Sequence, residues 1–366
     1  MTVKYTLLLA TSLALSSAIL AAESTAPEGA KAEGAKEPWT FNLYFENDLF
    51  SETDQQYTNG IRASWVSPNL EKTFFNDPSL PEWVRKYNSA LKFFHELNPN
   101  NSADYSLERN LVISFGQTMY TVSEQYIDET ALVLDDRPYA GYLFLGTAYH
   151  TKDDEQLDTI EVNLGIVGPS ALGQEAQDFV HKVRGFEKFK GWDNQLRDEP
   201  TLQIVYEHKH RVAERFLMDG KFQQDIIWHA GFSLGNLATY LNAGAEYRIG
   251  LQLPKDFGTA SLRTGGDSSA PMSGGIRRTQ NGFGGWHLFA SFDGRAVAHD
   301  IFLDGNTFKE SHSVDRRPLV GDMSVGFSFT YNRWKYSLAK VFRTREFEGQ
   351  ERSHSFGSLS ISYSWE

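Results

Sequence analysis

Residues that could perform hydrolytic chemistry concentrate in the segment 168–192, which has the pattern of a short helix. Its apolar residues recur at the i, i+3, i+4, i+7 spacing of one helical face, and these are Ala176, Phe179, Val180 and Val183. A different face carries Gln174, Gln177 and His181. We therefore expect the apolar face to dock against the rest of the protein and the polar face to carry the chemistry.

The residue types available near this helix suit hydrolysis of an ester. A neutral imidazole such as His181 can take a proton from water near neutral pH. The carboxylates of Asp48 and Glu187 are hard oxygen ligands that suit calcium. A cation, or the amide of Asn47 with the hydroxyl of Thr58, could then stabilise the oxyanion that forms when water attacks an acyl carbonyl. The sequence contains no HExxH pair, and its one G-x-S-x-G match, at 231–235, falls inside a predicted strand and not at the strand-to-helix turn of a nucleophile elbow, which disfavours a serine hydrolase and a zinc protease.

Each of these residues also has an ordinary structural interpretation. A loop histidine is often a surface residue, and Asn-Asp and Thr-Asn-Gly are common turn sequences. Glu187 follows Gly185 closely, so it could be a solvated residue after a helix end. Arg137, in the sequence DDRP, could pair with its neighbouring carboxylates or bind a phosphate. The residues by themselves leave these alternatives open.

The rest of the chain consists of segments with strand-like alternation. In the last segment apolar residues at 359, 361, 363 and 365 alternate with serine at 358, 360, 362 and 364, as expected for a wall with lipid on one side and water on the other. About twelve such segments occur: 39–47, 58–67, 109–119, 139–150, 157–167, 200–213, 225–235, 238–252, 285–302, 317–331, 333–345 and 354–365. This even number predicts an all-β fold, a transmembrane antiparallel β-barrel with a short helix in an extracellular loop.

Composition and the chain start support this assignment. Residues 1–22 have the pattern of a secretory signal peptide, 23–38 that of a disordered linker, and 39–366 would form the barrel domain. The chain has no cysteine, so no disulfide can stabilise it, and its 26 Phe, 16 Tyr and 8 Trp suit aromatic girdles. A net charge of −12 argues against nucleic-acid binding, because a protein that binds the phosphate backbone is expected to carry a basic surface. We expect a monomer in the bacterial outer membrane.

Barrel topology would collect the candidate residues at the outer rim. With both chain ends on the periplasmic side, the connections 48–57, 120–138 and 168–199 face outward. Asn47 continues the outward parity of its strand, so it would face lipid unless the strand bulges or a partner covers it. The helix of 168–199 could be that cover. Of the long inner connections, 68–108 predicts a periplasmic helix, and 253–284 is rich in Gly and Ser and predicts a mobile loop.

Three segments resemble, in order and at similar intervals, the outer-membrane lipid A 3′-O-deacylase family: FENDLFSETDQQYTNG, DDRPYAG and GPSALGQEAQDFVHKVRGFEK. The resemblance covers most of the chain from about Trp39 to its end. It implies a twelve-stranded barrel with its active site between the wall and the loop helix. It also implies calcium-dependent release of an ester-linked acyl chain from lipopolysaccharide in the outer leaflet.

By position, the resemblance assigns catalytic roles to His181, Asn47 and Thr58 and metal binding to Asp48 and Glu187. Gln177 beside His181 and Arg137 of DDRP would contact the substrate, lipid A. Two features depart from the family pattern, because Asp178 replaces an amide and the connection 120–138 is acidic where some members have a basic pair. An outer-membrane phospholipase, and a porin or adhesin without enzymatic activity, are the alternatives.

Overall fold

A computed structural model of the chain describes residues 38–48, 56–70, 108–217, 222–259 and 283–365. The predicted signal peptide, the linker except for Pro38, and the helix predicted within 68–108 lie outside these residues. In the part that is described, no helix is both long enough and apolar enough to cross a membrane.

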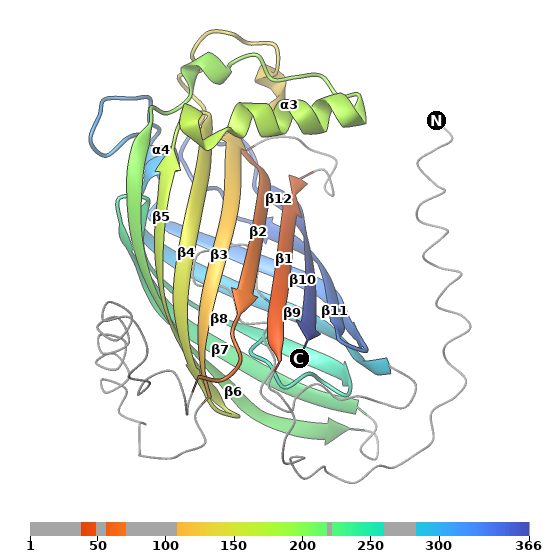
Figure 1. Cartoon of the computed structure of the whole chain (residues 1–366). Helices are drawn as coiled ribbons and strands as arrows, with labels where there is room; N and C mark the ends of the chain where they lie inside the picture. Colours follow the sequence, from red (N-terminus) through yellow and green to blue (C-terminus); the bar gives the residue numbers. More distant parts are fainter. Residues whose placement is uncertain (1–37, 49–55, 71–107, 218–221, 260–282, 366) are drawn as a thin grey trace, which may run out of the picture. The chain divides into compact units, whose positions relative to one another are not determined.

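The described chain forms a closed antiparallel barrel in which each strand pairs with its neighbours in sequence and β1 closes on β12 (Figure 1). The strands are β1 (Trp39–Asn47), β2 (Gln56–Val66), β3 (Glu108–Thr121), β4 (Ala140–Lys152), β5 (Gln156–Val167), β6 (Glu199–Leu217), β7 (Phe222–Gly235), β8 (Ala238–Leu251), β9 (Phe283–Asp300), β10 (Leu319–Tyr331), β11 (Trp334–Arg343) and β12 (His354–Trp365). All twelve predicted strands are confirmed. Their ends shift by a few residues, and β9 stops at Asp300 because α4 (Ile301–Asp304) begins there.

Alternation along each strand separates a lipid-facing side from a lumen side, as the sequence predicts. On β12 the serines at 358, 360, 362 and 364 are buried inside the barrel. Outward residues of β3 and β4 such as Ile113, Phe115 and Leu145 are half exposed or more, which suits contact with acyl chains. Aromatic rings gather where β1 begins and β12 ends, with Trp39 opposite Trp365 and the Trp334 and Tyr363 rings 4.5 Å apart. This cluster has the composition of an interfacial girdle.

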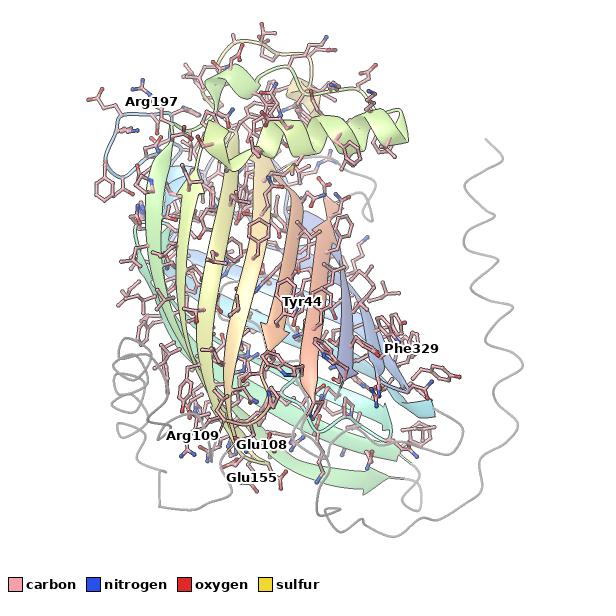
Figure 2. All side chains as sticks on the ribbon, in the orientation of Figure 1. Tyr44, Glu108, Arg109, Glu155, Arg197 and Phe329 are labelled. Carbon is pink, nitrogen blue, oxygen red and sulfur yellow. The ribbon has the colours of Figure 1, made fainter. Side chains whose placement is uncertain are left out.

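Charged residues lie at the two ends of the barrel. Figure 2 shows Glu108, Arg109 and Glu155 at the end where β3 begins and β4 meets β5, and Arg197 at the opposite end, beside the connection from β5 to β6. A band of apolar outer wall between two charged ends matches the thickness constraint that a bilayer imposes. The start of β1 and the end of β12 lie away from the Arg197 end, so with both chain ends on the periplasmic side the strand ends and loops at the Arg197 end form the outer rim.

The lumen is polar and is partly filled by the connection that follows β8. Residues 252–259 enter the barrel, where Asp256 accepts hydrogen bonds from Arg248 at 2.5 Å and Lys335 at 2.5 Å. Burial alone would raise the pKa of Asp256, but the charges of Lys335 and Arg248 outweigh it and lower the pKa to about 2. The described start of the connection predicted to be mobile, 253–259, is thus anchored by ion pairs to basic residues on separate strands. Residues 260–282 of that connection lie outside the described residues.

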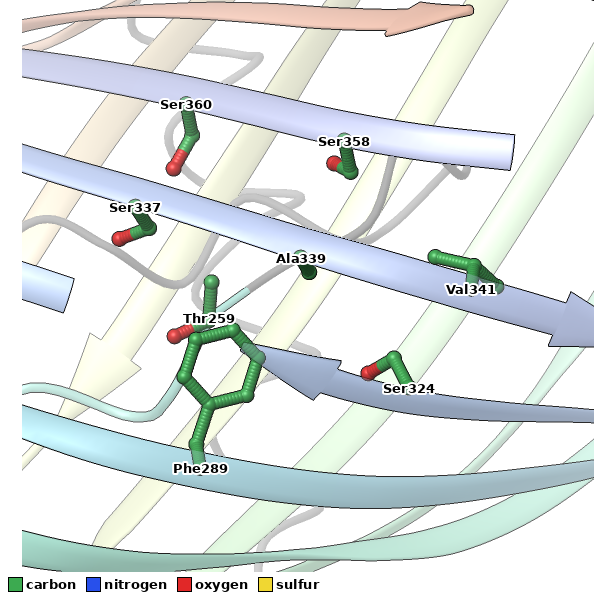
Figure 3. Close-up of a pocket in the computed structure, with 8 residues that line it drawn as sticks. All are labelled: Thr259, Phe289, Ser324, Ser337, Ala339, Val341, Ser358 and Ser360. Atoms are coloured by element: carbon green, nitrogen blue, oxygen red, sulfur yellow. The ribbon is translucent and has the colours of Figure 1, made fainter. Parts of the chain in front are cut away.

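A small cavity remains between this connection and the far wall of the lumen. It has a volume of about 10 Å³, room for about one water molecule, and is lined by Thr259, Phe289, Ser324, Ser337, Ala339, Val341, Ser358 and Ser360 (Figure 3). Hydroxyl groups dominate this lining, so the space suits water. The serine face of β12 that the sequence singled out is therefore a lumen wall.

Candidate active site at the outer rim

The loop helix α3 (Gly173–Arg184) lies across the outer ends of β2, β3 and β4 (Figure 1). It ends at Gly185, whose left-handed φ of 70° suits glycine and whose N–H donates to the carbonyl of His181. Its first residue, Gly173, approaches Gly141 of β4 so closely that a Cβ at Gly173 would lie 2.9 Å from the Cα of Gly141. Two glycines are needed for this contact between helix and strand.

Side-chain hydrogen bonds from the outward face of β3 fix the start of α3. Gln117 Nε2 donates to the carbonyls of Ala171 at 2.6 Å and Leu172 at 3.2 Å. These carbonyls precede the helix, so Gln117 ties the loop to the barrel wall just before α3 begins. The helix is thereby positioned by the rim itself.

The face of α3 that contacts the barrel is not the apolar face that the sequence predicted. Phe179 and Val183 are each 68% exposed, whereas Gln177 and His181 are 3% exposed. The prediction that the apolar face docks was wrong. Polar residues can face the protein here because a separate group of apolar side chains supplies the packing. We call this group the satellite core, and it consists of Met119, Val122, Tyr139, Phe189 and Trp192.

The ring of His181 is held in one tautomer. Its Nδ1 lies 2.5 Å from the backbone carbonyl oxygen of Glu187, and a carbonyl can only accept. Nδ1 must therefore carry the proton of the neutral ring, which makes Nε2 the basic nitrogen. The rings of Phe186 and Phe189 lie edge-on to His181 with centroids 5.9 Å and 6.3 Å away. Backbone and aromatic contacts thus orient the imidazole as a general base requires.

Gln177, one turn before His181, is oriented by Trp192. The indole Nε1–H of Trp192 donates to Gln177 Oε1 at 2.8 Å, and both side chains are buried. An indole can only donate, so it fixes the oxygen end of the amide. The Nε2 end of Gln177 is buried and has no hydrogen-bond partner among the described residues. The amide therefore presents two N–H donors beside the imidazole.

Asn47 and Thr58 meet at the ends of β1 and β2. Asn47 Nδ2 donates to the backbone carbonyl of Thr58 at 3.0 Å, and the Thr58 hydroxyl hydrogen-bonds that of Thr121 at 2.7 Å. The pairing of β2 with β3 slips between Tyr57 and Asn59, which makes Thr58 a bulge residue. The bulge turns Thr58 to the side that Asn47 and Thr121 share by strand parity. Asn47 keeps the outward parity that the sequence predicts.

The outward face of β3 links these two groups. Gln117, Met119 and Thr121 follow one another on this face, because alternate residues of a strand point to the same side. Gln117 binds the loop before α3, Met119 belongs to the satellite core, and Thr121 binds Thr58. The structure thereby brings Asn47 and Thr58 to the same side of the wall as Gln177 and His181.

The two predicted metal ligands differ in their surroundings. Asp48 is fully buried after the end of β1, whereas the side chain of Glu187 is exposed. Among the described residues, no three His, Cys, Asp or Glu side chains converge in a way that could hold a metal ion. The donors at hand are hard oxygens, and calcium accepts carboxylates together with carbonyls, hydroxyls and water. The chemistry of these donors is compatible with calcium, and the assignment of Asp48 and Glu187 as its ligands stays a prediction.

Arg137 is buried and belongs to an ion-pair network at the outer mouth of the barrel. Its Nη1 donates to Glu346 at 3.2 Å, and its guanidinium lies 4.5 Å from the centre of the Tyr120 ring. Burial would raise the pKa of Glu346, but the charges of Arg343 and Arg137 outweigh it and hold that pKa below its usual range. Arg137 therefore pairs across the mouth with Glu346, and its assignment to substrate binding stays a prediction.

Sequence reasoning missed several residues that build this site, above all Gln117, Thr121 and Trp192. A signal was available for two of them. Gln117 and Thr121 continue the outward parity of Ile113 and Phe115, and a polar residue on the lipid side needs a covering partner. The same argument had been applied to Asn47. The Trp192 contact carries no such pattern, because it forms between a helix and the loop that follows it.

Comparison with known proteins identifies the family to which this barrel belongs. The family model described as "Outer membrane protein LpxR" matches residues 7–365. The chain belongs to the LpxR family. The solved structure of LpxR from Salmonella typhimurium matches with a TM-score of 0.67 and 18% identity, covering 88% of this chain and 99% of that one. This match confirms the predicted barrel fold, and membership of an outer-membrane family confirms the predicted location in the outer membrane.

Other solved barrels are more distant from this LpxR-family chain. The β domain of the Bordetella autotransporter BrkA matches with a TM-score of 0.42 and 8% identity, covering 90% of this chain and 98% of that one. The KdgM porin matches with a TM-score of 0.36 and 6% identity, covering 89% and 99%. No curated protein matches the chain.

Proposed function

We propose that this LpxR-family protein is a lipid A deacylase that hydrolyses an ester-linked 3′-acyloxyacyl chain of lipopolysaccharide at the outer leaflet. The observation that carries the proposal is the hydrogen bond from His181 Nδ1 to the Glu187 carbonyl, which leaves Nε2 as the basic nitrogen on the wall-facing side of α3. A buried, oriented imidazole at the membrane-facing rim is suited to activate water against a lipid ester.

In the proposed reaction His181 Nε2 takes a proton from water while the hydroxide oxygen bonds to the acyl carbonyl carbon. The carbonyl oxygen becomes an oxyanion, and the Nε2–H groups of Gln177 donate to it. The intermediate then breaks its bond to the ester oxygen, which receives the proton from His181. The products are a free fatty acid and a lipid A hydroxyl group.

The catalytic roles expected of Asn47 and Thr58 stay part of the proposal. Asn47 Nδ2 donates to the Thr58 carbonyl and the Thr58 hydroxyl bonds that of Thr121, which fixes both residues at the rim. We propose that Asp48 and Glu187 hold calcium, which when bound would add positive charge near the developing oxyanion. Arg137 would act on the substrate electrostatically, through the charge of its ion-pair network at the outer mouth of the barrel.

Mass spectrometry of lipid A from cells that express the chain tests this proposal. Wild type should release one acyl chain, and His181→Ala should leave lipid A intact at the same level of folded barrel. Purified protein should be offered both lipid A and glycerophospholipid in the same detergent. Cleavage of glycerophospholipid alone would replace the proposal with a phospholipase, and loss of neither acyl group would refute an enzymatic role.

A further inference from the structure

The exposed apolar side chains of the outer loop lie on one stripe along α3. We call them the α3 stripe, and they are Leu172 at 51% exposure, Phe179 at 68% and Val183 at 68%. The three are separated by seven and four residues, which returns to the same side of a helix with 3.6 residues per turn.

Three sectors divide the circumference of α3. Gly173, Gln177 and His181 form the buried sector against the barrel. A second sector holds exposed polar residues, among them Gln174, Glu175 and Lys182. The α3 stripe is the third sector. At 3.6 residues per turn it lies roughly a third of a turn from the buried sector and from the polar sector. A helix fixed to the wall by one sector thus presents an apolar sector and a polar sector on opposite flanks.

The lipid-facing wall begins directly beside this helix. Gln117, which ties the start of α3, is two residues from Phe115 on the same face of β3. Phe115 pairs with Leu145, Leu145 with Leu164, and Leu164 with Leu202, so exposed apolar side chains form a continuous row across β3 to β6. Two strand residues span roughly 7 Å. The helix lies at the depth at which interfacial helices bury an apolar face.

From this arrangement we infer that α3 is an interfacial helix whose stripe of Leu172, Phe179 and Val183 is embedded among the acyl chains of the outer leaflet. The stripe continues the lipid-facing row of the wall, and the polar sector remains in water. The surface is thus a lipid contact. This inference rests on the barrel's placement in the membrane and does not require the proposed activity.

Single-cysteine labelling tests the inference, because the natural chain has no cysteine. Phe179→Cys and Val183→Cys would each carry a nitroxide spin label in barrels reconstituted into vesicles of palmitoyl-oleoyl phosphatidylcholine. Phe115→Cys is the control for the lipid-facing wall and Gln174→Cys the control for the polar sector of the same helix. Collision rates with oxygen, which concentrates in lipid, and with a nickel chelate, which stays in water, report the environment of each label.

The expected result is a several-fold higher ratio of oxygen to nickel collisions at 179 and 183 than at 174, close to the ratio at 115. Nickel accessibility at 179 and 183 equal to that at 174 would overturn the inference. Dipolar broadening between labels at 179, persisting on dilution with lipid, would also overturn it, because a second copy of the chain would then cover the stripe. All four positions are exposed, and heat-modifiable migration in electrophoresis confirms that each labelled barrel is folded.

Discussion

Replacing Trp192 with phenylalanine removes one hydrogen-bond donor from the site and keeps an aromatic ring in the satellite core. The indole Nε1–H is the group that fixes Gln177 Oε1, at 2.8 Å and in a buried environment. Without it the amide can rotate by half a turn, and a carbonyl oxygen can face the position where Gln177 now presents N–H groups. The variant therefore tests whether the orientation of Gln177 matters for acyl release.

The magnitude follows from the hydrogen bond that is lost. Leaving a buried acceptor such as Gln177 Oε1 without its donor costs about 1–3 kcal/mol. If that orientation is needed when negative charge develops on the carbonyl oxygen, the cost appears in the transition state. Because each 1.36 kcal/mol is a factor of ten in rate, kcat should fall by roughly 5- to 150-fold. KM should change little, because Trp192 is buried and acts only through Gln177.

The assay is release of fatty acid from lipid A by purified protein in detergent, measured by mass spectrometry over a range of substrate concentrations. Val122→Ala is the matched control, since it removes packing from the same satellite core without a polar group. It should lower stability and leave kcat close to wild type. A double-mutant cycle with Gln177→Ala completes the test.

The cycle separates orientation from packing. In the Gln177→Ala background Trp192→Phe should have almost no further effect on kcat, because no amide remains to orient. An equal loss of kcat in both backgrounds would refute the reasoning, as would a Trp192→Phe variant with wild-type kcat.

Three further predictions concern the base, the metal and the lumen. His181→Ala should abolish acyl release and keep heat-modifiable barrel folding, because α3 lies outside the strand pairing; normal activity of the purified variant would contradict the base assignment. Asp48→Ala and Glu187→Ala should each raise the calcium concentration needed for activity or abolish it, as titration after chelation would show; full activity in excess chelator would exclude a metal role. The pKa of Asp256 is about 2 in the folded protein, against an ordinary value of 3.8. Its ion pairs therefore stabilise the fold by roughly 2 kcal/mol above about pH 4, and this stabilisation is lost as the pH falls through 2. Urea unfolding should therefore show Asp256→Asn less stable than wild type at pH 7, with the difference shrinking near pH 2, and a constant difference would count against the ion-pair account.

The barrel and its orientation could be predicted from sequence because the pattern is local. The side-chain period of a strand is two, and lipid and water favour opposite residue types. The alternation in a segment such as 354–365 therefore predicts both that it is a strand and which of its sides faces lipid. Topology then places every second connection at the outer rim. The same reasoning predicts that Asn47 and Thr58 lie near the loop helix.

The docking of α3 could not be predicted in this way. A helical pattern shows that Phe179 and Val183 share a face, yet it does not say whether protein or lipid covers that face. In a soluble protein the apolar face turns inward. At a membrane rim the bilayer is a second apolar environment, and here the polar residues Gln177 and His181 turn to the wall instead.

The sequence by itself determined the number of strands, the side of each strand that meets lipid, and the residues that gather at the outer rim. These follow from periodicity and chain order, which need no knowledge of distant contacts. Only the tertiary structure decided the tautomer of His181, the direction of the Gln177 amide and the bulge at Thr58. Each of these depends on one hydrogen bond or register shift between segments that sequence spacing does not relate, so their geometry emerges only when the chain has closed into a barrel.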